Sequence, residues 1–455
     1  MNAAELNAMP GKKPSRDKSV PPGPTSPKFF NTMKVLRNPR AAFETWVAEY
    51  GDPFFVHALN GPIVVTGRPE LIKEVFAQDT SKFEVFGERA IRPMLGPGSM
   101  LMLDGEKHRR ERKLVMPMFH GSRMKAYGDI IRIATLDAME AVADRSSFEM
   151  ISVATDVSLK VIAQAILGGD QSGTTDRLTR LARETIDKSL PILFFSPRTQ
   201  ISFMGLSPWD RFTKARRTLR EAFDDELERR QKDPQPREDI LTMLLDARYE
   251  DGEAMSKEHL YDELGTFLMA GHETTAISLS WAIYFLLTNP EPLEQLKQEL
   301  AGGDTSDPAT LATLPYLKAV VSETLRLNPI VTEVLRVLRS PMELGGYEIP
   351  AGFAVAPAAA LTHYREDLYP EPERFRPERF LDRQYSSSEY LPFGGGTRRC
   401  AGAAFALYEL AIALGTIVTH FELELLEKTP VVPKRRNVVM GPSTGVLVRV
   451  TEKNQ

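Results

Sequence analysis

The apolar and polar positions divide the chain into a strand-rich start and a longer, mainly helical remainder. Residues 40–50 have helical periodicity, and residues 54–59 and 62–66 are apolar runs on either side of Asn60-Gly61, a pair typical of a tight hairpin turn. Residues 342–349 show a second hairpin pattern, and residues 421–425 and 445–450 alternate as strands do. Between 127 and 248, amphipathic helical segments follow one another, with glycine or proline at their breaks.

Two further segments predict long helices. Ser256 is a candidate N-cap for a helix that runs toward Asn289, because no proline interrupts this stretch. Gly271 lies in the middle of this helix, where glycine destabilises the helix by about 1 kcal/mol relative to alanine. The close approach of a ligand would explain a glycine at this position. Thr274 can return a hydrogen bond to a carbonyl and open the helix locally. Residues 403–418 form the second helix, which is apolar and free of proline.

Composition favours a soluble globular protein. The chain has 455 residues, of which 42% are hydrophobic, so it can bury a substantial core. A single cysteine excludes a disulfide framework and favours a reducing compartment, the cytoplasm, and a net charge of −4 gives no reason to expect nucleic acid. Residues 1–24 are polar and proline-rich, without the apolar run of a signal peptide or membrane anchor, and we expect a flexible tail before a single domain over residues 25–455.

The cysteine, Cys400, follows three consecutive glycines, residues 394–396, and precedes the apolar helix at 403–418. Glycine permits turns and close approach to a flat ligand, and the N–H groups at a helix N-terminus favour a thiolate. A lone cysteine is more often a small buried apolar residue. As a metal ligand, a lone thiolate cannot build a zinc or iron–sulfur site, but it is sufficient as the axial ligand of haem iron.

The residues around Cys400 decide between these alternatives. Phe393, Gly396, Arg398, Cys400 and Gly402 match every fixed position of Phe-x-x-Gly-x-Arg-x-Cys-x-Gly. This segment resembles the haem-binding loop of the cytochrome P450 family. Three individually weak motifs follow the family's order, at residues 270–275, 323–326 and 375–380, and the resemblance extends from about residue 21 to 450. It implies the cytochrome P450 fold, mainly α with a smaller β-rich portion, and haem b bound through Cys400.

The resemblance also implies roles for other residues. Glu273 and Thr274 would deliver protons for oxygen activation. Glu323, Arg326 and Arg379 would form a buried triad that pins the loop leading to Cys400. The remaining haem-binding positions would be His108, Arg112, Arg336, Arg398, Phe393, Gly396, Gly402, Ala270 and Gly271. His363 is a candidate for a haem propionate or, equally, a structural histidine.

The substrate pocket is expected to be apolar. Glycine and proline residues interrupt the segment 84–103, which is also rich in methionine, and this composition is typical of a flexible apolar loop. The candidate pocket residues are Met94, Met100, Phe194, Phe195, Ile330, Val331 and Val334. Because pocket walls come from scattered segments, fatty acids, terpenoids, steroids and macrolides all stay open as substrates.

The implied reaction inserts one oxygen atom from O2 into a C–H bond of a hydrophobic small molecule. Electrons would come from an external ferredoxin or flavodoxin with its reductase, because the chain has no cysteines for an iron–sulfur cluster and no length for a flavin domain. An acidic partner is expected from a basic patch formed by Lys107, Arg109, Arg110, Lys113 and Arg399.

Three alternatives stay open. A peroxide-driven haem-thiolate enzyme would not need the pair Glu273 and Thr274. A haem-binding sensor or carrier would need no proton relay. A structural protein without haem would be colourless.

Overall fold

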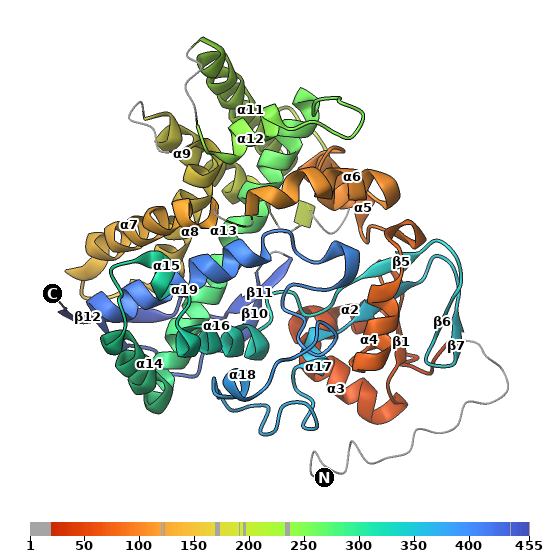
Figure 1. Cartoon of the computed structure of the whole chain (residues 1–455). Coiled ribbons are helices and arrows are strands. Elements are labelled where there is room, and N and C mark those ends of the chain that lie inside the picture. Colours follow the sequence, from red (N-terminus) through yellow and green to blue (C-terminus); the bar gives the residue numbers. More distant parts are fainter. Residues whose placement is uncertain are drawn as a thin grey trace.

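The computed structural model describes residues 20–119, 121, 123–168, 173–190, 192–193, 197–232, 237–436 and 438–454. Most of these residues are helical, as predicted (Figure 1). The helices of eight or more residues are α2 (Lys28–Arg37), α3 (Pro39–Tyr50), α4 (Pro69–Ala77), α5 (Glu88–Leu95), α6 (Gly105–Val115), α7 (Arg123–Ala143), α8 (Met150–Leu167), α9 (Thr174–Lys188), α11 (Pro208–Lys232), α13 (Lys257–Thr288), α14 (Pro290–Gly302), α16 (Pro315–Leu327) and α19 (Ala403–His420). Shorter helices are α12 (Ile240–Asp246), α15 (Pro308–Leu311), α17 (Ala359–Thr362) and α18 (Arg379–Asp382).

The strands form small sheets at the edges of the helical body. The largest sheet has the order β1 (Phe54–Ala58), β2 (Gly61–Thr66), β8 (Ala354–Pro357), β5 (Arg336–Leu338) and β3 (Phe83–Glu84). A second sheet has the order β4 (Phe148–Glu149), β12 (Leu447–Lys453) and β9 (Phe421–Leu425), and two hairpins join β6 (Met342–Leu344) to β7 (Tyr347–Ile349) and β10 (Pro433–Arg436) to β11 (Val439–Pro442). The predicted hairpins at 54–66 and 342–349 are therefore confirmed, each with antiparallel pairing.

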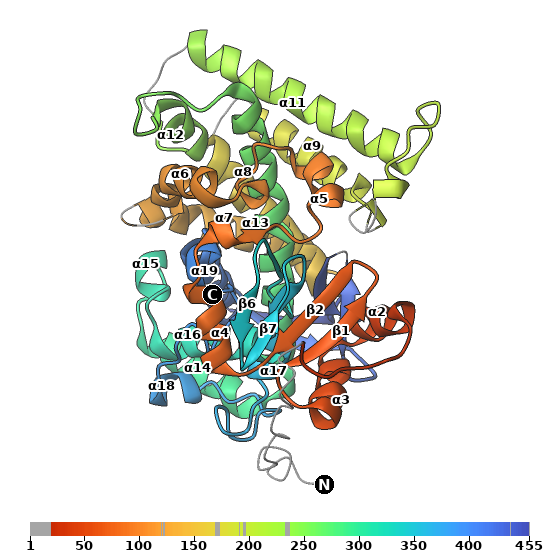
Figure 2. The same cartoon turned by 90° about the vertical axis from the view of Figure 1, so that its right-hand side faces the viewer.

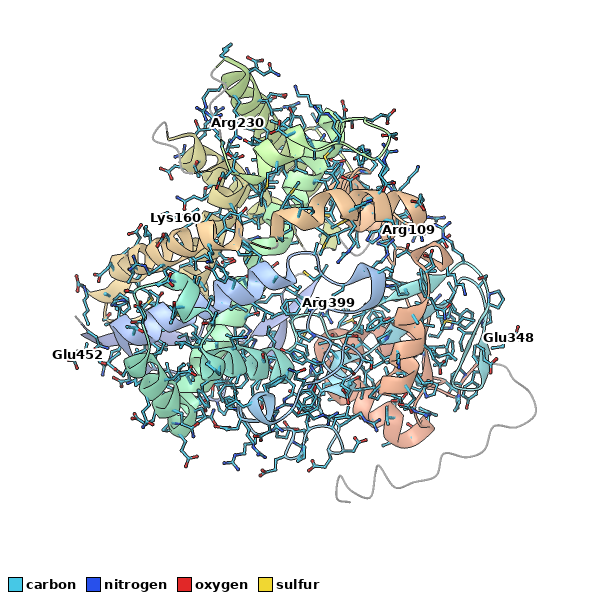
Figure 3. The ribbon with its side chains drawn as sticks, in the orientation of Figure 1. Arg109, Lys160, Arg230, Glu348, Arg399 and Glu452 are labelled. Carbon is cyan, nitrogen blue, oxygen red and sulfur yellow. The ribbon has the colours of Figure 1, made fainter. Side chains whose placement is uncertain are left out.

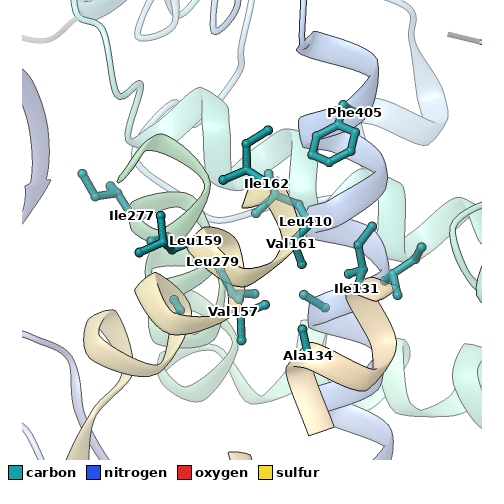
Figure 4. Close-up of a cluster of buried hydrophobic side chains, with 14 of the residues drawn as sticks. Ile131, Ala134, Val157, Leu159, Val161, Ile162, Ile277, Leu279, Phe405 and Leu410 are labelled. Atoms are coloured by element: carbon teal, nitrogen blue, oxygen red, sulfur yellow. The ribbon is translucent and has the colours of Figure 1, made fainter. Parts of the chain in front are cut away.

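Helix α13 runs through the middle of the molecule and is the axis of the hydrophobic core. It packs along α8 and against α19, and α7 packs on both α8 and α19 (Figure 4). Side chains from all four helices meet there, for example Ile131, Ile162, Ile277 and Phe405, which are all at most 5% exposed. The helix that bears the 270–275 motif is thereby fixed relative to the helix that follows Cys400.

The ends of α13 follow from its sequence. The Ser256 side chain accepts a hydrogen bond from the His259 N–H at 3.3 Å, so the predicted N-cap is confirmed. Asn289 ends the helix, and the next residue, Pro290, opens α14. The predicted hydrogen bond from Thr274 back to a carbonyl is present, to Ala270 at 2.8 Å, and the residues from Lys257 to Thr288 stay α-helical without interruption.

Helix α11 crosses one end of the molecule above α9, α5 and the first half of α13 (Figure 2). Its apolar positions, Phe212, Ala215, Leu219, Ala222 and Phe223, recur three or four residues apart and are buried. The many charged residues between 211 and 232 conceal this apolar face in the sequence. Helix α11 is consequently one wall of the region above α13.

Two sequence-based expectations about irregular segments are corrected. Residues 84–103 are not a flexible loop: they contain α5 and a 3-10 turn at Met100–Met102, and α5 accommodates Pro93 within it. Residues 21–24, which we assigned to the tail, pack on β1, where the Phe55 N–H donates to the Pro22 carbonyl at 3.0 Å. The rest of the predicted tail, residues 1–19, lies outside the described residues.

Among the described residues, α8 and α19 are long and apolar enough to span a membrane. Both pack in the core, where about two thirds of each helix is buried, and their apolar composition is accounted for by contacts with α7 and α13. They therefore behave as core helices of this fold.

Candidate active site

The loop that carries Cys400 is closed by its own backbone. The Cys400 N–H donates to the Phe393 carbonyl at 2.9 Å, and the Arg399 N–H donates to the Gly396 carbonyl at 3.1 Å. The ring of Phe393 packs against the main core. These bonds hold the cysteine three residues before α19 begins at Ala403.

Glycine allows the predicted turn in this loop, where Gly394 has φ +63°, and it also allows a close approach that was not predicted. Gly396 has φ +64°, and a Cβ at that position would lie 2.4 Å from the Phe76 carbonyl oxygen of α4. A Cβ on Gly395 would lie 2.2 Å from the Phe76 ring. The close approach is thus made to α4, whereas we had expected a flat ligand. Gly402 has an ordinary φ of −84° and free space around its Cβ direction, so the fold itself does not explain it.

Cys400 is exposed, yet protein atoms surround its sulfur closely enough for burial to raise the pKa of the thiol. The Gly402 N–H and the charges of Arg112 and Arg399 act in the opposite direction. The Gly402 N–H thus favours the thiolate, as predicted for a helix N-terminus, but burial of the sulfur is the larger effect on its pKa. A metal cation bound to the sulfur would reverse this balance.

Four basic side chains from three segments meet beside this loop: His108 and Arg112 from α6, Arg336 from β5, and Arg398 from the cysteine loop. Burial and then the charges of Arg398, Arg112 and Arg336 lower the pKa of His108 to about 4. Burial and Arg398 lower the pKa of Arg336 to about 10. These mutual effects show that the four groups lie close together and repel one another.

Their hydrogen bonds leave most of their donors unused. Arg336 donates to the Leu335 carbonyl at 3.1 Å and Arg398 donates to the Leu103 carbonyl. The Nδ1 atom of His108, a side chain that is 2% exposed, has no hydrogen-bond partner among the described residues. The nearby carboxylate of Asp104 forms an ion pair with Arg339. A concentration of buried positive charge with an orphaned imidazole fits a ligand that carries carboxylates.

The residues present therefore fit haem, a flat group with two propionates and an iron that accepts one axial thiolate. Cys400 would supply the thiolate, and His108, Arg112, Arg336 and Arg398 would hold the propionates. The structure brings these five sequence-predicted residues to one place, although they come from segments separated by nearly 300 residues.

The predicted proton-delivery residues lie on α13. The Thr274 hydroxyl donates to the Ala270 carbonyl at 2.8 Å, and the Thr275 hydroxyl donates to the Gly271 carbonyl at 3.0 Å. Ala270 is exposed, whereas Glu273 and Thr274 are half-buried. The Thr274 hydroxyl keeps two acceptor lone pairs while it donates, so it can accept a proton or hydrogen bond from a neighbouring group.

Gly271 has a structural explanation that we did not anticipate. A Cβ on this residue would lie 3.3 Å from the Ile162 side chain of α8, closer than ordinary contact. The glycine therefore permits close packing of α13 on α8, and its carbonyl also accepts a hydrogen bond from Ser158 at 3.4 Å. We had attributed it to a ligand.

Glu323, Arg326 and Arg379 form a buried ion-pair triad. Arg326 holds the Glu323 carboxylate with two hydrogen bonds of 2.6 and 2.8 Å, and Arg379 donates to the same carboxylate at 3.0 Å. All three residues are at most 4% exposed. Because Arg326 lies on α16 and Arg379 on α18, the triad joins α16 to the segment that leads toward Cys400.

His363 is bonded to the chain around this triad, so it has a structural role and does not bind a propionate. Its Nε2 atom accepts the Leu391 N–H at 2.8 Å, and its Nδ1 atom lies 3.0 Å from the Arg326 carbonyl. Burial lowers the pKa of His363 to about 3, so the ring is neutral and carries its proton on Nδ1. The structural alternative is the correct one: His363 links the triad to the chain just before the cysteine loop.

A pocket lies between α5, α9, α11 and α13. Its apolar lining includes Met94, Ile186, Phe212, Phe223, Leu268 and Met269. Met269 immediately precedes the 270–275 motif, so the pocket lies along the same helix as Thr274. Of these residues only Met94 was predicted. The periodic apolar positions of α11 were the signal that could have found Phe212 and Phe223.

The other predicted pocket residues lie elsewhere. Met100 is buried in the main core, Ile330 is 6% exposed in that same core, and Val331 is 45% exposed on the surface. Val334 lies beside the cysteine loop, with a methyl 3.7 Å from where a Cβ on Gly394 would be. Phe194 and Phe195 lie outside the described residues.

The expected basic patch is largely neutralised. Arg109 pairs with Asp79 and Glu106, Arg110 pairs with Asp251 and Glu253, and Lys113 pairs with Glu250. Figure 3 shows Arg109 on α6 above the loop that bears Arg399. Lys107 and Arg399 are exposed and have no ion pair with a described carboxylate. The patch therefore carries a smaller surplus of positive charge than the sequence suggested, because acidic residues from other segments fold against it.

Comparison with known proteins agrees with this fold and site. The family model described as cytochrome P450 matches residues 21–449. "Putative cytochrome P450 138" of Mycobacterium tuberculosis is 34% identical over 436 residues, which cover 94% of this chain and 95% of that protein. "Putative cytochrome P450 135B1" of the same species is 34% identical over 443 residues, covering 95% of this chain and 91% of the relative.

A solved structure, "Retinoic acid bound cyanobacterial CYP120A1", superposes with a TM-score of 0.84 and 24% identity, and the match covers 96% of this chain and 100% of that one. The fold is thus that of a haem-thiolate monooxygenase. The chain belongs to the cytochrome P450 family.

Proposed function

We propose that this cytochrome P450, a haem-dependent monooxygenase by family, binds haem b through the Cys400 thiolate. It inserts one oxygen atom from O2 into a C–H bond of a hydrophobic small molecule held in the pocket between α5, α9, α11 and α13. The single observation that carries this proposal is the meeting of Cys400 with four basic side chains, His108, Arg112, Arg336 and Arg398, that have almost no carboxylate to pair with. The haem, when bound, supplies the redox and oxygen chemistry.

The chain's own residues then have separable tasks. Arg112, Arg336 and Arg398 would neutralise the propionates, and the neutral His108 ring would donate a hydrogen bond to one of them. The triad of Glu323, Arg326 and Arg379 holds the cysteine loop rigid. Thr274 contributes a hydroxyl and Glu273 a carboxyl, and protons move through these two groups of α13 from solvent to the site. The pocket walls orient the substrate and exclude water.

Electrons come from a separate protein, and we propose a ferredoxin or flavodoxin with its reductase in the cytoplasm. The support is the family itself, which implies a redox partner in general, and the exposed cation Arg399 beside Cys400, which suits an acidic partner.

Replacement of the ligand tests the proposal. The Cys400→Ser variant, if it still takes up haem, should lose the red-shifted absorption band that a thiolate ligand gives to the ferrous carbon monoxide complex. Thr397→Ala, an exposed position of the same loop, is the matched control and should keep the band. A parent protein that expresses colourless, or a Cys400→Ser variant that keeps the band, would refute the assignment.

A further inference from the structure

Two arginines of α11 share one buried carboxylate at the wall of the pocket. Arg216 Nη2 donates to Asp262 Oδ1 at 3.0 Å, and Arg220 Nη2 donates to the same oxygen. The Asp262 side chain is 1% exposed, whereas those of Arg216 and Arg220 are 21% and 36% exposed. Both arginines line the pocket together with the apolar side chains of α5 and α13.

Both oxygens of the Asp262 carboxylate already accept hydrogen bonds, so Asp262 cannot offer a second oxygen to the two arginines. Its second oxygen accepts the Gly98 N–H at 3.0 Å. A Cβ on Gly96 would lie 2.0 Å from the carboxylate, so the chain at residues 96–98 encloses it. The carboxylate is therefore held in one orientation and offers a single oxygen to both guanidinium groups.

The positive charges at this wall exceed the negative ones. Burial and the repulsion of Arg220 lower the pKa of Arg216 despite the ion pair with Asp262. Neighbouring acids do not supply the missing charge. Burial raises the pKa of Glu263 well above its usual range, and its carboxyl accepts the Met100 N–H. Asp224 forms an ion pair with Lys257. Two guanidinium groups thus share one negative charge beside an apolar pocket.

We propose that this pocket takes an amphipathic anion, a hydrophobic molecule with a terminal carboxylate that binds between Arg216 and Arg220. The unused guanidinium N–H groups match a carboxylate in geometry and charge, and Phe212, Phe223 and Leu268 accept the apolar chain. This inference rests on the proposed monooxygenase function and names the substrate class.

The arrangement also predicts which part of the substrate is oxidised. Asp262 and Thr274 lie on the same helix twelve residues apart, which corresponds to about 18 Å along its axis. A carboxylate held at the arginines places the reacting carbon far along the chain, toward its apolar end. An extended chain spans roughly 3.6 Å per three bonds, so roughly 15 bonds separate the bound carboxylate from the reacting carbon.

Matched ligands test the proposal on the purified holoprotein. Hexadecanoic acid and hexadecanamide have the same chain, and their dissociation constants can be read from the shift of the haem absorption band. We expect the acid to bind at least about tenfold more tightly than the amide, because a charge-assisted hydrogen bond contributes that much. Equal affinities, or no binding of either, in a protein with full haem content would overturn the inference. Failure to incorporate haem would instead refute the proposed function.

Two variants change the charge of the wall in opposite directions. Arg220→Gln leaves the Arg216–Asp262 pair intact and removes the surplus, so the affinity for the acid should fall about tenfold while that for the amide is unchanged. Asp262→Asn increases the surplus and should strengthen binding of the acid. Arg217→Gln, at a 72% exposed position of α11 outside the pocket, is the control. An Arg220→Gln protein with parental preference for the acid would contradict the assignment.

Discussion

At the scale of single residues, the site depends on side chains whose environment decides their charge. His108 illustrates this, because burial and three arginines keep its imidazole neutral at physiological pH. A neutral ring can still donate one hydrogen bond to a propionate, while the arginines provide the positive charge. The sequence alone could place His108 and Arg112 on one helical face, but it could not show that Arg336 and Arg398 lie beside them.

Proton delivery gives a prediction at the same scale. Glu273→Gln and Thr274→Ala should each consume reducing equivalents with less product and more hydrogen peroxide, and product formation should fall roughly tenfold or more, because a positioned proton donor is lost. Thr274→Ser keeps the hydroxyl that donates to the Ala270 carbonyl and is the matched control. The ratio of peroxide to product is the measurement. Parental ratios in both variants would place the proton path elsewhere.

At the scale of elements, α19 carries a buried acid with no role in the chemistry described above. Glu409 is 1% exposed, and within the part of the chain that the structure describes its Oε1 atom has no hydrogen-bond partner. Burial raises its pKa to about 8, while a hydrogen bond with Ser158 of α8 opposes this. The carboxyl is consequently neutral in the folded protein at neutral pH, as a core helix requires.

Stability should therefore depend on pH in a defined direction. Between pH 4.5 and about 8, Glu409 keeps its proton in the folded state and loses it in the unfolded state, so stability falls as pH rises, by at most about 5 kcal/mol. Glu409→Gln should flatten this fall. Thermal unfolding midpoints of the holoprotein at pH 5 and pH 8 provide the comparison, with the exposed Glu424→Gln as control. A variant midpoint that falls with pH as steeply as the parental one would show that Glu409 is already ionised.

The elements also show what the sequence could predict. Caps, prolines and apolar periodicity located α13, α19 and both hairpins, because these signals are local. The reasons for Gly271 and Gly396 were not predictable, since each is explained by a neighbour on another element, Ile162 and Phe76. The pocket wall on α11 was missed because its many charges concealed a regular apolar face.

At the scale of the whole molecule, the same limit applies to surface charge. The sequence showed the cations of α6, whereas their acidic partners come from residues 79 and 250–253, which only the fold brings near. The net charge of a surface is a property of several segments at once. The docking surface for an electron donor therefore depends on the cations that these ion pairs leave uncompensated.

Lys107 and Arg399 are the cations of this surface that retain uncompensated charge, and Arg399 adjoins Cys400. An electron-transfer encounter is small, transient and steered by charge, so we expect an acidic ferredoxin to dock here. A Lys107→Glu/Arg399→Glu protein should accept its first electron several-fold more slowly at low ionic strength, where screening extends to about 30 Å, and the difference should shrink as screening shortens to about 10 Å. Stopped-flow reduction measures this rate. Arg110→Gln/Lys113→Gln is the control, because those cations already pair with carboxylates and their loss should change the rate less. A rate that ignores both ionic strength and the reversal at Lys107 and Arg399, with haem content unchanged, would place the docking surface elsewhere.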